Sequence, residues 1–130
     1  MTIAVRRSGI AQIKVAPDAP AAYDVVPKLA TAILALGNNT VADLLGVSRS
    51  QPGRWARRQE GIAHANEVAI LDLDFVLSLL LRAMSADLAG LWLVSPNAHL
   101  GGARPVDAFR VDGHRRVVEA LQAYADGAYA

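Results

Sequence analysis

Four arginines stand in a stretch of ten residues that contains no acidic residue: Arg49, Arg54, Arg57 and Arg58. A guanidinium group can pair with a phosphate or with the edge of a guanine through two parallel hydrogen bonds. Because the whole chain has a formal net charge of only +1, this window is its one basic feature. A run of arginines alone is more often a solvated surface than a nucleic-acid-binding site. The neighbouring residues must therefore distinguish these two interpretations.

Residues suited to catalysis are scattered. His64, His99 and His114 stand in predicted loops and helix starts, without the close pairing that a metal site needs. No serine or carboxylate stands in a known nucleophile motif, so we expect no catalytic residue, no metal and no cofactor. Each histidine is predicted to be a surface or capping residue, and Asp72 and Asp74 to form the solvated edge of a long helix.

The composition favours packed helices with a partner surface. Of 130 residues, 53% are hydrophobic but only 5% aromatic, so much of the apolar content is Ala, Leu and Val. The absence of cysteine fits a reducing compartment. The longest apolar stretch, residues 68–81, is interrupted by two aspartates and is too short to span a bilayer, and no secretory signal is evident. We therefore expect a cytoplasmic protein without a membrane segment.

The first predicted helix lies before the arginine window, between Pro27 and Gly37. Leu29, Ile33 and Leu36 recur on one helical face between Pro27, which suits a first turn, and Gly37, which supplies a stop.

The next helices are short. Thr40 is predicted to cap one that ends at Gly46. Ser48 is predicted to open the helix that carries the arginines, with Gln51 as its capping-box partner and a stop near Gly61.

A long helix is predicted over residues 66–84, with Asn66 as its cap. It is apolar on two faces, one made by Val68, Leu71, Phe75 and Leu79 and the other by Ile70, Leu73, Leu77 and Leu80. Such a helix is usually central. Because one small core cannot cover both faces, we predict a dimer interface at Leu73, Leu77 and Leu80.

The remaining elements complete an all-α fold, a helix-turn-helix bundle followed by a C-terminal helical region. A helix starts at Ser85 and ends at the turn of residues 95–97. A glycine loop at 101–102 leads to a short helical turn at 105–110, and Gly113 precedes the last helix. No internal repeat and no alternating strand pattern is evident.

The segment TVADLLGVSRSQPGRWARRQEG resembles the Xre-type helix-turn-helix through its Leu-Gly-Val-Ser turn and the Arg-Trp that follows. The resemblance implies a recognition helix that enters the major groove of DNA. The implied DNA-binding residues are Ser48, Arg49, Ser50, Gln51, Arg54, Arg57 and Arg58. Pro52 and Gly53 depart from the family pattern and predict a helix that begins late or bends.

The segment LWLVSPNAHLGGARPVDAFRVDGHRRVVEALQAYADGAYA is similar to the toxin-binding domain of the MbcA/ParS/Xre antitoxins. The pattern is Trp-Leu-x-x-Pro-Asn, then Leu-Gly-Gly, Pro, Asp-Gly, Val and a closing Gly-aromatic. The resemblance implies toxin-binding residues at Trp92, Pro96, Asn97, Leu100, Gly101, Gly102, Pro105, Asp112, Gly113, Tyr124, Gly127 and Tyr129. It also implies that the partner is a RES-domain toxin, an enzyme that consumes NAD or transfers its ADP-ribose.

Three regions follow: a flexible segment at 1–22, the helix-turn-helix region at 23–65, and the long helix with the toxin-binding domain at 66–130. The function indicated is that of an antitoxin that inhibits its toxin, binds operator DNA and represses its own operon, as a homodimer or a larger assembly with the toxin. The alternatives are a stand-alone dimeric transcription regulator, and an adaptor in which Pro52 has abolished DNA binding.

Overall fold

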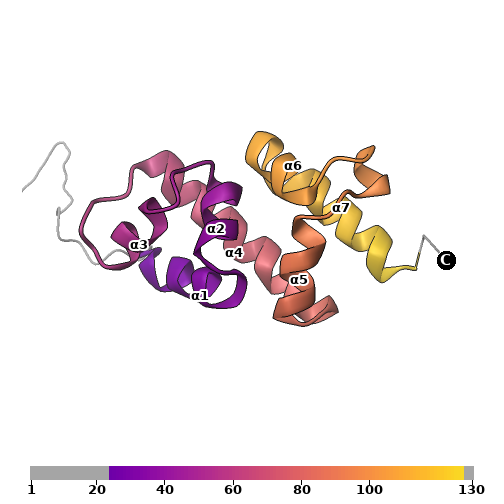
Figure 1. Cartoon of the computed structure of the whole chain (residues 1–130), viewed down its shortest axis with the longest axis horizontal. Helices are drawn as coiled ribbons and strands as arrows, with labels where there is room; N and C mark the ends of the chain where they lie inside the picture. The colour runs from indigo at the N-terminus through magenta and orange to yellow at the C-terminus, as the bar shows by residue number, and fades with distance from the viewer. Residues whose placement is uncertain (1–23, 128–130) are drawn as a thin grey trace, which may run out of the picture.

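The computed structural model describes residues 24–127, and the predicted lead-in at 1–22 lies outside them. The described residues form helices and no strand, which confirms the predicted all-α class (Figure 1). The elements are α1 (Val26–Leu36), α2 (Asn38–Leu45), α3 (Gln51–Ala56), α4 (His64–Ala83), α5 (Ala86–Leu93), the 3-10 turn η1 (Ala98–Leu100), α6 (Pro105–Asp112) and α7 (His114–Ala125). No helix within this range has the length and apolar character needed to cross a bilayer.

Gly37 both ends α1 and starts α2. Its φ of 87° is closed to most other residues, and the chain re-enters the helical region at Asn38. The predicted Thr40 cap is therefore wrong, because α2 has already begun and Thr40 lies inside it. Gly46 ends α2 in the left-handed conformation, as the sequence predicts.

The start of α3 differs from the prediction. Ser50, and not Ser48, occupies the cap position, and no side chain caps the helix. Pro52 is the reason that the helix begins late: it lies buried in the first turn, where a backbone N–H is not needed. The Ser48–Gln51 capping box is wrong, since the Gln51 amide donates instead to Glu60 at 3.0 Å.

The long helix α4 is central, as its two apolar faces predict. It packs against α1, α2, α5 and α7, and Figure 1 shows it running between the two ends of the molecule. It starts at His64, so Asn66 is not its cap.

The predicted dimer contacts need correction. Leu73, Leu77 and Leu80 are 0, 3 and 0% exposed, because the core of the single chain covers them. They offer no surface to a second copy. The face of α4 that stays open is the other one, where Val68 is 52% and Phe75 47% exposed.

The C-terminal helices share this core with the N-terminal ones. Ser85 caps α5 by accepting a hydrogen bond from the Leu88 amide at 3.2 Å, as predicted. The helix α6 packs on both α7 and α2, and buried residues of all seven α-helices form one cluster. The regions predicted as 23–65 and 66–130 are thus packed together, and their division into domains stays a prediction.

The core predicts a contrast between two leucines. Leu73→Ala should lower the free energy of unfolding by about 2–5 kcal/mol, because it leaves a cavity in a covered site. Leu34 is 89% exposed on α1, so Leu34→Ala should change it by less than about 0.5 kcal/mol. Urea unfolding followed by circular dichroism measures both. Equal losses in the two variants would contradict the assignment of the core.

Candidate functional site

Three of the four predicted arginines surround one hollow. Arg49, Arg54 and Arg57 line a space of about 430 Å³ together with residues from the start of α2 and the first turn of α3. The hydroxyls of Ser48 and Ser50 lie 3.4 Å apart on the turn that leads into it. The helix pair α2–α3 therefore presents its donors on one side, which is the arrangement that the arginine window predicts.

Arg54 is held by three neighbours. Its guanidinium donates to Glu60 at 2.7 Å, to the Ser50 hydroxyl at 2.6 Å and to the Gln51 side-chain oxygen at 2.8 Å. The pKa of Glu60 is lowered, first by the hydrogen bond from Gln51 and then by that from Arg54. Glu60 is thus a carboxylate that both orients Arg54 and offsets its charge. The sequence prediction missed Glu60, because it stands just outside the acid-free window.

Arg49 and Arg57 have different surroundings. Arg49 pairs with Asp43 at 3.4 Å, and its backbone carbonyl accepts a hydrogen bond from the Asn38 amide. Among residues 24–127, no ion pair involves Arg57. A Cβ added at Gly53 would lie 3.1 Å from the Arg57 guanidinium, so the glycine leaves room for that side chain against α3.

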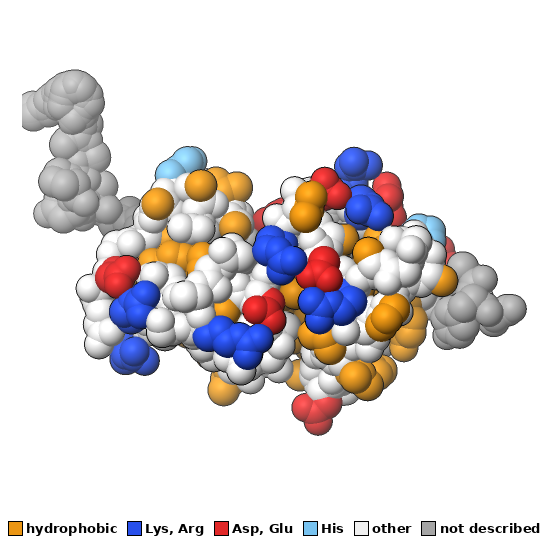
Figure 2. Space-filling model, turned by 45° about the horizontal axis from the view of Figure 1, so that its top comes forward, with side chains coloured by type: hydrophobic (Ala, Val, Ile, Leu, Met, Phe, Trp, Pro, Cys, Tyr) orange, Lys and Arg blue, Asp and Glu red, His pale blue; other side chains and the backbone are white. Residues whose placement is uncertain are grey.

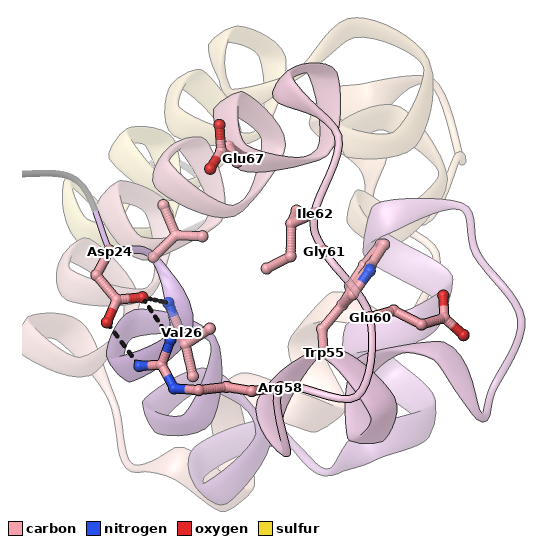
Figure 3. A pocket seen from close by; sticks show the side chains of 9 residues that line it. Asp24, Val26, Trp55, Arg58, Glu60, Gly61, Ile62 and Glu67 are labelled. Carbon is pink, nitrogen blue, oxygen red and sulfur yellow. Dashed lines mark hydrogen bonds and ion pairs between the residues drawn. The ribbon is translucent and has the colours of Figure 1, made fainter. Parts of the chain in front are cut away.

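Arg58 is placed apart from the other three arginines. It lines a separate cavity of about 300 Å³ beside Asp24 and the buried Trp55 (Figure 3). Its guanidinium pairs with Asp24 at 2.6 Å, and this hydrogen bond lowers the pKa of the Asp24 carboxyl. The φ of Arg58 is +58°, an uncommon left-handed value for a side-chain-bearing residue. Its contacts here serve the turn after α3.

The C-terminal hollow collects four of the predicted toxin-binding residues. Trp92, Pro96, Asn97 and Tyr124 line a space of about 220 Å³ between the η1 loop and α7. Asn97 fixes this loop, because its side chain accepts from the His99 amide at 2.9 Å and its own amide donates to the Ala103 carbonyl at 3.0 Å. A hollow lined by a tryptophan, a proline and a tyrosine can receive an apolar side chain of a partner.

The prediction missed the residues that make this space hollow. Ala120 and Ala123 of α7 line its wall, where larger side chains would fill it. The available signal was that small residues share a face of the predicted last helix with Val117 and Tyr124.

The other predicted toxin-binding residues hold the backbone or lie elsewhere. Leu100 and Pro105 are buried, while Gly101, Gly102 and Gly113 adopt positive φ. Asp112 pairs with Arg116 at 3.3 Å at the junction of α6 and α7. Gly127 is the last described residue, and Tyr129 lies outside the described residues.

Two residues predicted separately form a pair. Asp72 of α4 and His114 of α7 are hydrogen-bonded, and the His114 ring also meets the edge or face of Phe75 at 5.4 Å. From the sequence, His114 is predicted to be a surface or capping residue and Asp72 a solvated one, whereas the structure places them in contact with each other. Residues 24–127 contain no cluster of three or more side chains fit to hold a metal ion.

Comparison with known proteins finds a matching family, similar proteins and a similar solved structure. Residues 73–127 match the family described as the antitoxin Xre/MbcA/ParS C-terminal toxin-binding domain. The mycobacterial cidal antitoxin MbcA of Mycobacterium tuberculosis and of Mycobacterium bovis is 28% identical over 96 residues, which cover 74% of this chain and 85% of that protein. A chain of the crystal structure of the M. tuberculosis MbcT–MbcA toxin–antitoxin complex superposes with a TM-score of 0.69 at 27% identity, over 82% of this chain and 98% of that one.

The backbone conformation of Gly113, between α6 and α7, leads to a prediction about stability. Its φ of 75° and ψ of −149° lie in a region reserved for glycine, and an added Cβ would lie 3.0 Å from the Asp72 carboxylate. Gly113→Ala should therefore cost about 1–3 kcal/mol of stability. Gly61→Ala is the control, because a Cβ there meets nothing within 4 Å. Thermal unfolding distinguishes the two; an unchanged Tm for Gly113→Ala would disprove the strain.

Proposed function

Because residues 73–127 match the toxin-binding domain of the Xre/MbcA/ParS antitoxins, we propose that the chain binds and inhibits a cognate RES-domain toxin, an enzyme that consumes NAD or transfers ADP-ribose. It acts in the cytoplasm and has no catalytic activity of its own. The observation that carries the proposal is the match of residues 73–127 to a toxin-binding domain that, in this chain, contains a preformed hollow.

The docking surface is the C-terminal hollow and the outer face of α5. Leu88 and Leu91 of α5 and its C-cap residue Val94 follow one another at helical spacing near Trp92, and all three are exposed. An apolar patch of this kind on a small protein marks a partner surface. Trp92 and Tyr124 at the hollow are the residue types that anchor interfaces.

The chain end supplies the inhibiting segment in this proposal. Tyr124 to Ala130 reach the NAD cleft while the region from Trp92 to Asp112 docks. The support in the described residues is Gly127, whose left-handed φ of 69° lets the chain turn away from the axis of α7.

The helices α2 and α3 bind operator DNA and repress the antitoxin's own operon. The support is the hollow that gathers Arg49, Arg54 and Arg57 beside the seryl turn. Pro52 does not disrupt this surface, since α3 simply begins at Gln51. This observation favours a DNA-binding antitoxin over an adaptor without DNA binding. The stand-alone regulator remains the alternative, and it would leave the C-terminal hollow unused.

The toxin-binding proposal predicts that filling the hollow blocks inhibition. Ala123→Arg places a long charged side chain in the space, so affinity for the toxin encoded by the neighbouring gene should fall at least tenfold, about 1.4 kcal/mol. Ala30→Arg adds the same group at an exposed position of α1 and should leave affinity unchanged. Calorimetry and NAD consumption by the toxin measure the effect. The hollow is not the docking site if both variants bind and inhibit like the original chain.

The DNA-binding proposal predicts opposite effects for two paired residues. Arg54→Ala should weaken binding to the duplex upstream of the gene on the order of tenfold, because one bidentate contact is lost. Glu60→Gln should strengthen binding a few-fold, since the competing negative charge disappears while the side chain keeps its size and one of its two acceptor oxygens. Glu119→Gln makes the same charge change on α7 and serves as the control. Fluorescence anisotropy at several salt concentrations measures DNA binding by each variant. If Glu60→Gln weakened binding, Glu60 would serve only to hold Arg54 in place and would not compete with DNA.

A further inference from the structure

A band of alternating charges joins the helix-turn-helix to the C-terminal domain. Asp43 of α2 pairs with Arg49 at 3.4 Å, and its backbone carbonyl accepts a hydrogen bond from Arg110 of α6 at 3.2 Å. Arg110 in turn shares Asp107 with Arg104, each at 2.8 Å. Figure 2 shows blue and red side chains interleaved across one face of the molecule. The arginines of α6 thus continue the surface that starts at α3.

Arg110 lies beside the end of α2, and in a helix-turn-helix the helix at this place crosses the DNA backbone. Its aliphatic stem is so close to Gly46 that an added Cβ there would lie 3.2 Å from it. Gly46 ends α2, and in this motif the helix before the recognition helix crosses the phosphate backbone. A cation fixed at this point stands next to the turn that leads to the recognition helix.

Arg104, the N-cap residue of α6, and Arg110 within the helix are both partly exposed, as is the acid that they share. The side chains of Arg104 and Arg110 are 44 and 42% exposed, whereas Asp107 between them is 35% exposed. The pKa of Asp107 is lowered, first by the hydrogen bond from Arg104, so the acid is ionised at neutral pH. Both guanidinium groups are accessible to an incoming polyanion, and such exposed ion pairs are rearranged easily because they contribute little to stability.

We propose that Arg104 and Arg110, which lie in the segment proposed to dock the toxin but do not line its apolar hollow, contact DNA phosphates beside the site read by α3, and so extend the DNA-binding surface beyond the helix-turn-helix. The proposal rests on DNA binding by α2 and α3. It assigns one partner, the backbone of double-stranded DNA, which offers no sequence information at this position. The arginines then add affinity for any sequence and leave specificity to α3.

The test uses the full chain with Arg104→Gln and Arg110→Gln together, which keep long polar side chains but remove two charges. The probes are the upstream duplex and a scrambled duplex of equal length, followed by anisotropy from low to moderate salt. We expect weaker binding to both duplexes and a slope of log K against log salt that is flatter by about 1.8, or about 0.9 for each lost phosphate contact. Asp107→Asn should steepen the slope, because the acid no longer competes.

The control is Arg115→Gln, which removes a charge from an exposed residue of α7 outside the band. Thermal unfolding checks that the double variant folds. If the original chain binds the duplex and the double variant keeps its slope, the inference fails while DNA binding by α3 stands. If the double variant loses toxin affinity and keeps the slope, the band belongs to the toxin and the inference also fails. If the original chain binds neither duplex, DNA binding itself fails, and the inference with it.

Discussion

The structure depends on the apolar face of α4, because every other α-helix except α3 and α6 packs directly against it. Leu73, Val76 and Leu80 of that face are fully covered by the chain itself. Removing one of them opens a cavity that neighbouring side chains fill only in part. Both candidate surfaces depend on this helix, since α2 and α7 each pack directly against α4.

A second contact fixes the two surfaces relative to each other. The pair α2–α6 brings Arg110 over Gly46, where any larger residue would meet its stem. Gly46 therefore has two roles: it permits the left-handed end of α2, and it leaves room for α6 to approach. One face of α2 packs against the arginine turn and another packs against α6. A displacement of α6 would therefore also displace the turn.

Much of the fold could be predicted from spacing alone, since Leu29, Ile33 and Leu36 mark α1, and the glycines at 37, 46 and 113 stand between successive helices. Helix starts were less predictable. Thr40, Ser48 and Asn66 are all good cap residues, yet each helix begins without them. Gly37 and Pro52 set the starts of α2 and α3, and α4 begins at His64 without a side-chain cap. Periodicity shows that a face is apolar but not what covers it, which is why the buried leucines of α4 were assigned to a dimer. Glu60 stands just outside the arginine window in the sequence, but only the folded turn after α3 shows that its carboxylate pairs with Arg54.

The carboxylates beside the arginines bear on the proposed DNA-binding surface, because the whole chain has a net charge of only +1. Arg54, Arg49 and the α6 arginines each have an acidic neighbour, so the long-range field of the band is weak. A weak field limits nonspecific capture by nucleic acid, because that capture depends on phosphate neutralisation. A duplex that fits the turn can still displace the acids, since an exposed ion pair contributes only about 0–1 kcal/mol, whereas a well-placed bidentate contact to a base contributes about 1–3 kcal/mol. Pairing each cation with a nearby acid therefore sacrifices some affinity for every sequence and improves the discrimination between them.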